Sequence, residues 1–240
     1  MIKIFKGFAL AFNMLSIIPL FKIHNFFKGI NGYAVMFYPL VGFILGSVLW
    51  GVYTILLPYI HPIHLGIIIF GMWVLLTGAL HLDGFCDTID GLFVSKEKAL
   101  KVMKDPHIGG MGMIFGGVFL ILKASTLATF NAFYMLPVIL MLSRLNASIA
   151  IYLYPYLSQN GIGSLAKKEF DKKLFFITIT YTLLLGMWVY WGLVVISLLV
   201  LFVSKYFFVK RYGGFSGDIY GFIIELTELI LLNAIIVGLN

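Results

Sequence analysis

Residues 77–110 read TGALHLDGFCDTIDGLFVSKEKALKVMKDPHIGG and hold half of the ten Asp and Glu residues of the chain, between tracts that are almost entirely apolar. Asp83, Asp87 and Asp90 are spaced i, i+4 and i+7, which places them within an arc of about 60° on an α-helix. Three like charges on one stripe repel one another. The stripe therefore favours a positive charge from outside the chain. A divalent cation bound by the hard carboxylate oxygens would supply that charge beside a membrane segment.

The composition of the whole chain indicates a polytopic membrane protein. Of 240 residues, 61% are hydrophobic and 11% are charged, whereas soluble domains carry about 25% charged residues. The net charge of +7 is distributed as short basic clusters between apolar runs, a pattern of membrane orientation and not of nucleic-acid binding. A single cysteine, Cys86, excludes an intrachain disulfide and a cysteine-rich metal site.

Seven apolar tracts are long enough to cross a hydrocarbon core about 30 Å thick. They are residues 34–57, 65–82, 110–130, 133–156, 174–190, 192–209 and 218–239. The fifth and sixth are divided near Gly186 and Gly192 on length alone. Residues 3–21 lack a signal-peptide cleavage site and predict an attached interfacial or re-entrant helix. We expect an all-α transmembrane bundle of about seven spans, a cytoplasmic acidic helix after span two, and one integral membrane domain over residues 1–240.

The basic residues predict how the bundle is oriented. With seven spans, every cluster between spans falls on one side: Lys3, Lys6, Lys22, Lys28, Lys96, Lys98, Lys101, Lys104, Lys167, Lys168, Lys172, Lys173, Lys205, Lys210 and Arg211. The opposite connections, 58–64, 131–132 and 191, carry no Lys or Arg. The positive-inside bias predicts that the charged side faces the cytoplasm, with lipid around the spans.

Two cations, Lys123 and Arg144, fall inside predicted spans, where insertion of each costs about 2.5–3.5 kcal/mol. Facing inward near carboxylates, they suit an anionic substrate, to which Arg offers a bidentate fork and Lys a point charge. The alternatives are that each snorkels to an interface or neutralises a structural carboxylate.

A second informative segment is GGFSGDIYG, residues 213–221, which runs into the last span. A glycine-rich turn before a helix presents free backbone N–H groups and the positive end of the helix dipole, which favours a phosphate. Asp218 and Glu225 share one helix face, with Glu228 one turn further on. Alternatively, Asp218 caps the helix and Glu225 pairs with Lys123 or Arg144.

These motifs together resemble the cobalamin synthase family, the adenosylcobinamide-GDP ribazoletransferases. The resemblance rests on His81-Leu82-Asp83-Gly84, Asp87-Thr88, Asp90-Gly91, Met103-Lys104-Asp105, Ile108-Gly109, Lys123, Ser143-Arg144, Gly213-Gly214, Ser216-Gly217-Asp218 and Glu225-Leu226-Thr227-Glu228. Pro106-His107 departs from the family pattern, which has a small polar residue and an arginine there. The resemblance implies a Mg²⁺-dependent enzyme of the bacterial or archaeal cell membrane. Such an enzyme joins adenosylcobinamide-GDP to α-ribazole or its 5′-phosphate and releases GMP.

That chemistry suggests a role for each candidate residue. Mg²⁺ would be held by Asp83 and Asp87, with Asp90 and Asp218 completing the site or adding a second ion. Asp83, Asp87, Asp105 and Glu225 are the candidate catalytic carboxylates, of which Asp105 or Glu225 would take the hydroxyl proton. The candidate substrate-binding residues are His81, Lys104, Lys123, Arg144, Gly214 and Gly217. His81 is equally consistent with a plain interfacial histidine.

Two other functions are consistent with membrane carboxylates. A CDP-alcohol phosphotransferase requires D-G-x2-A-R, whereas Asp83-Gly84 leads here to Cys86-Asp87 with no Arg in place. A cation-coupled transporter requires carboxylates near the bilayer centre and matched broken helices in two halves, and the sequence shows no internal repeat. The sequence leaves the oligomeric state open. It predicts that the acidic stripe near residue 87 and the segment near residue 218 converge at the cytoplasmic side.

Overall fold

The computed structural model describes residues 2–20, 22–23, 26–158 and 161–238, with residues 187–190 described by their backbone alone. The helices are α1 (Ile2–Leu15), α2 (Ile30–Leu56), α3 (Pro62–Leu76), α4 (Leu80–Leu92), α5 (Lys96–Met103), α6 (Gly110–Thr129), the 3₁₀ helix η1 (Phe133–Met135), α7 (Leu136–Leu153), α8 (Ile162–Glu169), α9 (Lys172–Tyr212) and α10 (Gly217–Gly238). The described residues form no β-strand, apart from one isolated bridge between Tyr156 and Phe215. The predicted all-α fold is confirmed.

Five helical stretches of the described chain are long and apolar enough to cross a membrane: α2, α6, η1 with α7, Trp191–Tyr212 of α9, and α10. The bent pair α3 and α4 provides a sixth if the two form one span. All five stretches agree within a few residues with predicted spans. The protein is therefore a helical membrane protein, whereas the count of seven spans stays a prediction.

The predicted span over residues 65–82 is not one straight helix. Helix α3 ends at Leu76, and α4 leaves it at an angle of 83°. The cause is local, because Gly78 and Ala79 both adopt left-handed backbone conformations, with φ of 59° and 55°. Glycine tolerates that conformation, and a single alanine there is uncommon. The break re-aims α4 and, with it, the acidic stripe.

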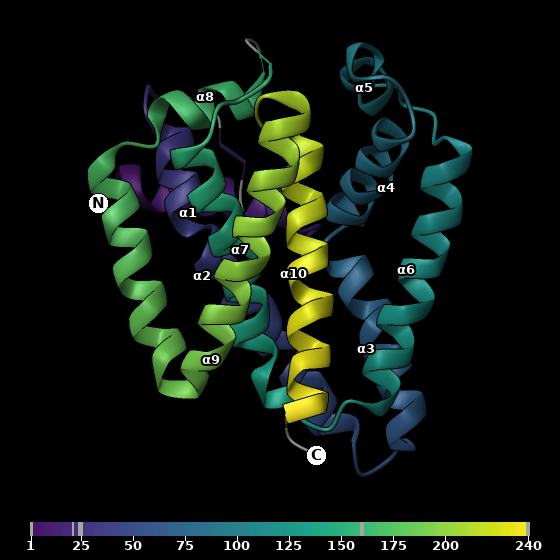
Figure 1. Ribbon diagram of the computed structural model, residues 1–240. Helices are drawn as coiled ribbons and strands as arrows, with labels where there is room; N and C mark the ends of the chain where they lie inside the picture. Colours follow the sequence, from purple (N-terminus) through teal and green to yellow (C-terminus); the bar gives the residue numbers. More distant parts are fainter. Residues whose placement is uncertain (1, 21, 24–25, 159–160, 239–240) are drawn as a thin grey trace.

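Helix α9 has helical backbone over all 41 of its residues, yet the direction of its axis reverses. Figure 1 shows its ribbon running down the bundle and back up to the starting end. A Cβ placed on Gly186 would lie 3.6 Å from Val194 Cγ2. Residues eight apart in a straight helix are separated by about 12 Å, so the chain must fold back between these two positions.

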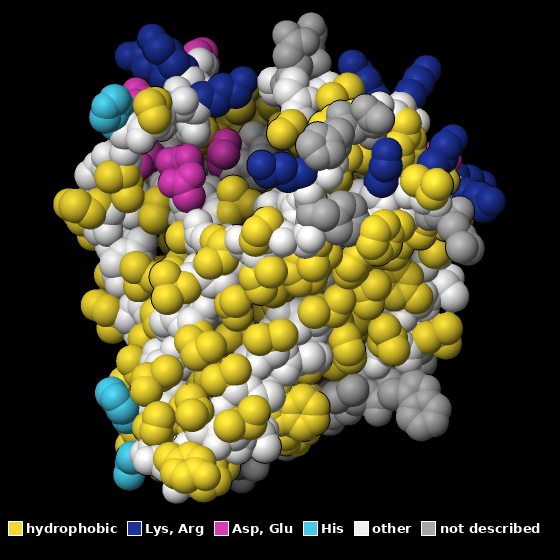
Figure 2. Space-filling model, turned by 180° about the vertical axis from the view of Figure 1, so that it is seen from behind, with side chains coloured by type: hydrophobic (Ala, Val, Ile, Leu, Met, Phe, Trp, Pro, Cys, Tyr) yellow, Lys and Arg dark blue, Asp and Glu magenta, His cyan; other side chains and the backbone are white. Residues whose placement is uncertain are grey.

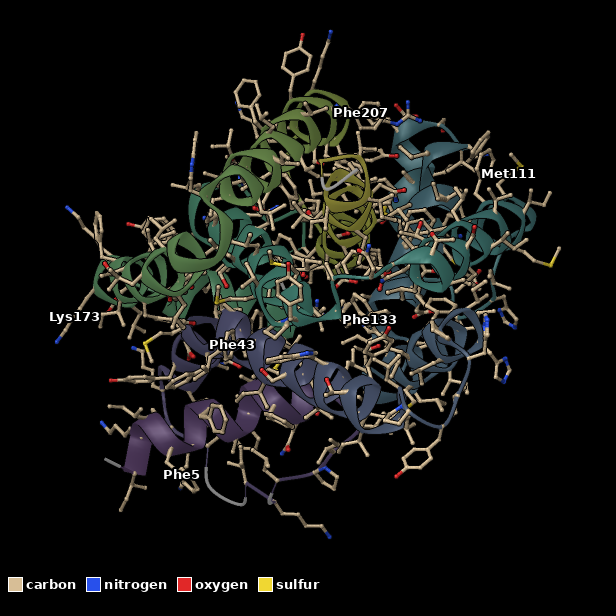
Figure 3. All side chains as sticks on the ribbon, turned by 90° about the horizontal axis from the view of Figure 1, so that it is seen from below. Phe5, Phe43, Met111, Phe133, Lys173 and Phe207 are labelled. Atoms are coloured by element: carbon tan, nitrogen blue, oxygen red, sulfur yellow. The ribbon has the colours of Figure 1, made fainter. Side chains whose placement is uncertain are left out.

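Helix α7 forms the centre of the bundle, with 89% of its span buried, and α2, α9 and α10 pack around it (Figure 1). Gly42 and Gly46 of α2 lie against the backbone carbonyls of Leu140 and Leu136, where any Cβ would overlap. Small residues permit this close approach of membrane helices. Viewed along the bundle in Figure 3, Phe133 lies toward the interior, where it stacks on Tyr53 with 3.6 Å between ring centroids.

The surface divides into a charged end and an apolar belt. On the face shown in Figure 2, the Lys and Arg side chains gather at one end, Asp and Glu side chains lie close by, and the region below is mostly hydrophobic. Helix α1 is seen from its side in Figure 3, whereas α10 is seen end-on, so α1 lies across the bundle axis. That orientation agrees with the predicted interfacial helix.

Candidate active site

The two acidic segments meet where α4 packs against α10. A Cβ on Gly84 would lie 2.9 Å from Asp218 O, and a Cβ on Gly221 would lie 3.0 Å from His81 O. Both glycines are therefore needed for the two backbones to approach so closely. Because of this contact, Asp83 and Asp218 line one cavity, which has a volume of about 270 Å³. The predicted convergence of the two segments is confirmed.

The cavity lies between α1, α2, α4, α7, α8 and α10. Its polar side carries Asp83 and Asp218, with Gly217 beside them, and its remaining wall is mostly apolar. The wall also contains three tyrosines, Tyr38, Tyr156 and Tyr220, which the sequence analysis did not single out. Only Tyr220 carried a signal, because it lies inside the segment 213–221.

Ser216 caps the start of α10, where Gly217 and Asp218 line the cavity. Ser216 Oγ accepts from Ile219 N–H at 3.2 Å and donates to Asp218 Oδ2 at 3.2 Å, so it caps the helix and steadies the carboxylate. Gly217 is exposed and has open space around it. Gly214 is buried against Pro155 O, where no Cβ would fit. Of the two glycines predicted to contact substrate, Gly217 alone lines the cavity.

The acidic stripe divides into two parts. Asp83 is exposed at the cavity, and Asp87 is half-buried within electrostatic reach of Asp83 and Asp218. Asp90 is buried and accepts from the N–H groups of Gly109 at 2.8 Å and Gly112 at 2.7 Å, which fixes the start of α6. These two contacts give Asp90 a structural role, and its proposed part in metal binding stays a prediction.

A separate ionic cluster is sealed among α6, α7 and α10. Lys123 Nζ donates at 2.6 Å to both Glu225 Oε2 and Glu228 Oε2 and lies 4.2 Å from the ring centre of Trp73. Arg144 pairs with Glu228, and Ser143 Oγ bonds the same carboxylate at 3.2 Å. Lys123, Arg144, Glu225 and Glu228 are each at most 3% exposed, and none lines the cavity. The alternative in which Glu225 pairs with Lys123 is the observed one, and direct substrate contact by these residues is not supported.

The other predicted residues lie at different distances from the cavity. His81 lines it, is 4% exposed, and leaves Nε2 with no hydrogen-bond partner in the described part of the chain. Lys104 is exposed and donates to Ser158 Oγ at 3.3 Å. Asp105 borders a different hollow, next to α6, and bonds His107 Nδ1 at 2.8 Å. The hydrogen bond from His107 lowers the pKa of Asp105.

The carboxylates at the cavity have no direct ion-pair partner in the part of the chain that the structure describes. Among the described residues, Asp83, Asp87 and Asp218 form no ion pair with Lys, Arg or His. That part of the chain also contains no ready-made metal-binding group of three or more His, Cys, Asp or Glu side chains. Mg²⁺ is commonly held by one or two carboxylates together with substrate phosphates and water, so a complete protein cage is not required. The donor chemistry at the cavity therefore fits Mg²⁺.

The fold and the cavity define a class: a polytopic helical membrane protein with unpaired carboxylates and a helix N-terminus at one cavity. Comparison with known proteins narrows this class. The model of the cobalamin-5-phosphate synthase family matches residues 7–236, and the chain belongs to that family.

Curated relatives match most of the chain. An adenosylcobinamide-GDP ribazoletransferase of Desulfitobacterium hafniense (strain Y51) is 35% identical over 213 residues, covering 82% of this chain and 83% of the relative. The protein of that name from Acinetobacter baumannii (strain ACICU) is 35% identical, with 87% of each chain covered. That from Desulforamulus reducens (strain ATCC BAA-1160 / DSM 100696 / MI-1) is 34% identical, covering 98% of this chain and 97% of its own. No solved structure matches the chain.

Proposed function

We propose that the chain transfers the cobinamide-phosphate group of adenosylcobinamide-GDP to α-ribazole or its 5′-phosphate, with release of GMP. Family membership over residues 7–236 carries this proposal. We propose the cavity as its location, which is supported by the carboxylates Asp83 and Asp218 and the N-terminus of α10 at the same space. The enzyme is of the cobalamin synthase type, and its dependence on Mg²⁺ is part of the proposal.

The reaction breaks the phosphoanhydride bond of the diphosphate and forms a phosphodiester. A ribose hydroxyl oxygen bonds the phosphorus attached to cobinamide, the bond from that phosphorus to GMP breaks, and the hydroxyl proton passes to a carboxylate. The positive end of the α10 dipole, at Gly217 and Asp218, stabilises negative charge on the phosphates. Asp83 or Asp218, on the cavity wall, accepts the proton. Glu225 and Asp105 are poorly placed for that step, because Glu225 is engaged by Lys123 and Asp105 borders another hollow.

Asp83, Asp87 and Asp218 would hold Mg²⁺. When bound, the ion would neutralise charge on the diphosphate oxygens. The chain supplies the rest: α10 orients the phosphates, the apolar wall excludes water, and Lys104 lies within electrostatic reach of Asp218 at the edge of the site. Lys104 would steady the diphosphate from there.

The cavity is proposed to face the cytoplasm. The Lys- and Arg-rich end seen in Figure 2 supports this orientation through the positive-inside bias. A Ser158→Cys variant in a Cys86→Ala background tests it. An impermeant thiol reagent should label that variant in inside-out vesicles and not in right-side-out vesicles. Labelling only of the right-side-out vesicles would place the site outside the cell.

The competing functions find less support. A cation-coupled transporter needs carboxylates free to take up an ion inside the bundle, whereas Glu225 and Glu228 already pair with Lys123 and Arg144. The deciding experiment is a product assay in isolated membranes. GMP release should require adenosylcobinamide-GDP, α-ribazole and Mg²⁺ together. Release that is independent of α-ribazole would contradict the transfer reaction.

A further inference from the structure

We propose that the cavity is the binding site of the riboside acceptor, with the flat base against Tyr156 and Tyr220 and the ribose toward Asp83 and Asp218. This inference rests on the proposed transfer reaction and specifies which of its two substrates enters the bundle. The corrinoid macrocycle then stays outside the cavity, and only its phosphate end reaches the carboxylates.

The size and length of the cavity support this assignment. Its volume of about 270 Å³ is near the lower limit of small-molecule pockets, about 300 to 1,000 Å³. On α10 its lining runs from Gly217 to Ile224, which spans about 10 Å at 1.5 Å per residue. A nucleoside has this length, whereas a corrinoid is much larger than the space.

The two ends of the cavity differ in chemistry. Gly217 and Asp218 lie at the start of α10, whereas Ile224 lies two turns deeper. Ile151 of α7 and Ile162 of α8 complete an apolar wall. Tyr220 lies three residues from Gly217, and Tyr156 is within electrostatic reach of Asp218. A base against these two rings would therefore place its sugar hydroxyl close to the carboxylates.

The aromatic rings offer a stacking surface. Tyr156 and Tyr220 lie within 19° of parallel, with 6.1 Å between ring centroids. Tyr220 is also nearly parallel to Phe215, at 5.9 Å and 12°. Flat heterocycles stack on such rings because every base has a π-face. The backbone of Tyr156 forms an isolated bridge with Phe215, which fixes this segment beside the start of α10.

Two buried polar groups at the cavity lack partners. Within the described residues, the Tyr220 hydroxyl and His81 Nε2 form no hydrogen bond, although their side chains are only 7% and 4% exposed. Buried polar atoms are almost always satisfied, so unpaired ones in a cavity point to a ligand. The Tyr220 hydroxyl can donate to a ring nitrogen, and His81 can bond a ribose hydroxyl.

The wall favours a riboside of a benzimidazole-type base over guanosine, the other nucleoside in the reaction. A benzimidazole has one free ring-nitrogen acceptor and an apolar edge, which match one hydroxyl donor and the isoleucine wall. Guanine carries several donors and acceptors, and most of these would be left unpaired against Ile151, Ile162 and Ile224. Specificity would then follow from the small number of polar atoms in the cavity.

The test is Tyr220→Phe in the full-length protein in lipid nanodiscs, with Tyr134→Phe as a matched control, because Tyr134 is 49% exposed and outside the cavity. Loss of one hydrogen bond should raise KM for α-ribazole about three- to tenfold. We expect kcat and KM for adenosylcobinamide-GDP to stay within about twofold, the margin expected when no bond to that substrate is lost. A rise in KM for the corrinoid, a change in kcat alone, or no change would overturn the proposal.

A second variant and a binding measurement keep the test decisive. Ala147→Leu would place a larger side chain in the cavity and should weaken binding of α-ribazole more than that of the corrinoid. Binding of α-ribazole alone, measured calorimetrically, should be lost in that variant, and excess GMP should not displace α-ribazole from the native protein. Displacement by GMP overturns the assignment to the acceptor. If the native protein binds α-ribazole but transfers nothing, the proposed reaction fails while the site assignment stands.

Discussion

The bundle contains two groups of charged residues that differ in how their charges are balanced. Asp83, Asp87 and Asp218 lie at or beside a cavity and form no ion pair among the described residues. Lys123, Arg144, Glu225 and Glu228 are sealed between helices, and each cation has a carboxylate partner. Both groups are charged, yet within the described chain only the first has no cation to balance its carboxylates.

This difference separates function from structure. A buried charge must be compensated, and a cluster that compensates itself holds helices together without needing a ligand. A cluster of like charges costs free energy until a cation or substrate arrives. Uncompensated charge therefore marks the candidate active site more reliably than depth in the membrane does. The predictions below test the distinction, from the largest expected effect to the smallest.

The largest effect is expected from Asp83→Asn and Asp87→Asn. Each removes one hard oxygen donor, and turnover should fall at least about 100-fold, as when one group stabilising a transition state is lost. Thermal stability should be unchanged or slightly higher, because a like-charge contact is relieved. Product assays and thermal melts of the purified protein measure the two effects. Glu97→Gln, on exposed α5, is the control and should remain active. Near-native rates in both Asp variants would remove the metal-site proposal.

Glu228→Gln should lower the stability of the protein more than its chemistry, the opposite of the Asp83 and Asp87 variants. It leaves the buried guanidinium of Arg144 without its partner, which typically costs about 3–5 kcal/mol of stability. Thermal unfolding in detergent measures this loss. Adding Arg144→Met should recover part of it, because the pair is then removed together. A Glu228→Gln protein with native stability and no activity would show instead that this cluster takes part in catalysis.

Gly221→Ala should lower both stability and activity, by less than the preceding variants do, because it disturbs the contact between α4 and α10. The new Cβ would lie 3.0 Å from His81 O and 3.3 Å from Gly84 Cα, so α4 and α10 must separate. Such overpacking costs about 1–3 kcal/mol, and activity should fall because Asp83 moves away from Asp218. Gly117→Ala is the matched control, since a Cβ there meets nothing within 4 Å. It should be neutral or stabilising. An active, native-like Gly221→Ala protein would mean that the close contact is not needed.

Much of the fold could be predicted because hydrophobic length is a local property. The helices α2, α6, α7 and α10 were expected within a few residues, and the acidic stripe was expected on a helix. The break after Leu76 could not be predicted, because left-handed conformations at Gly78 and Ala79 leave no mark in an apolar run. The fold-back of α9 was placed near Gly186 by length alone.

Some parts of the candidate site could be predicted from the sequence, and others could not. Convergence of Asp83 and Asp218 followed from two motifs at helix ends on the same side. Pairing of Lys123 with Glu225 was one of two open alternatives, because it depends on a contact between residues 102 apart. The tyrosines of the cavity were missed because aromatic residues make up 17% of the chain and serve mainly packing. Only the three-dimensional arrangement separates Tyr220 from the others.

The smallest effect is expected from Asp105→Asn, although Asp105 is an acid close to the site in sequence. Its side chain is 55% exposed, and its pKa is lowered chiefly by the hydrogen bond from His107. A lowered pKa stabilises the fold above the unfolded value of about 4 and ceases to do so as the pH falls below it, so nothing should change near neutral pH. Turnover and the pH profile between 6 and 8 should match those of the native protein within about twofold, the range of an exposed side chain. A loss as large as that of Asp83→Asn would give Asp105 a catalytic role. The distinction between compensated and uncompensated carboxylates would then no longer identify the site.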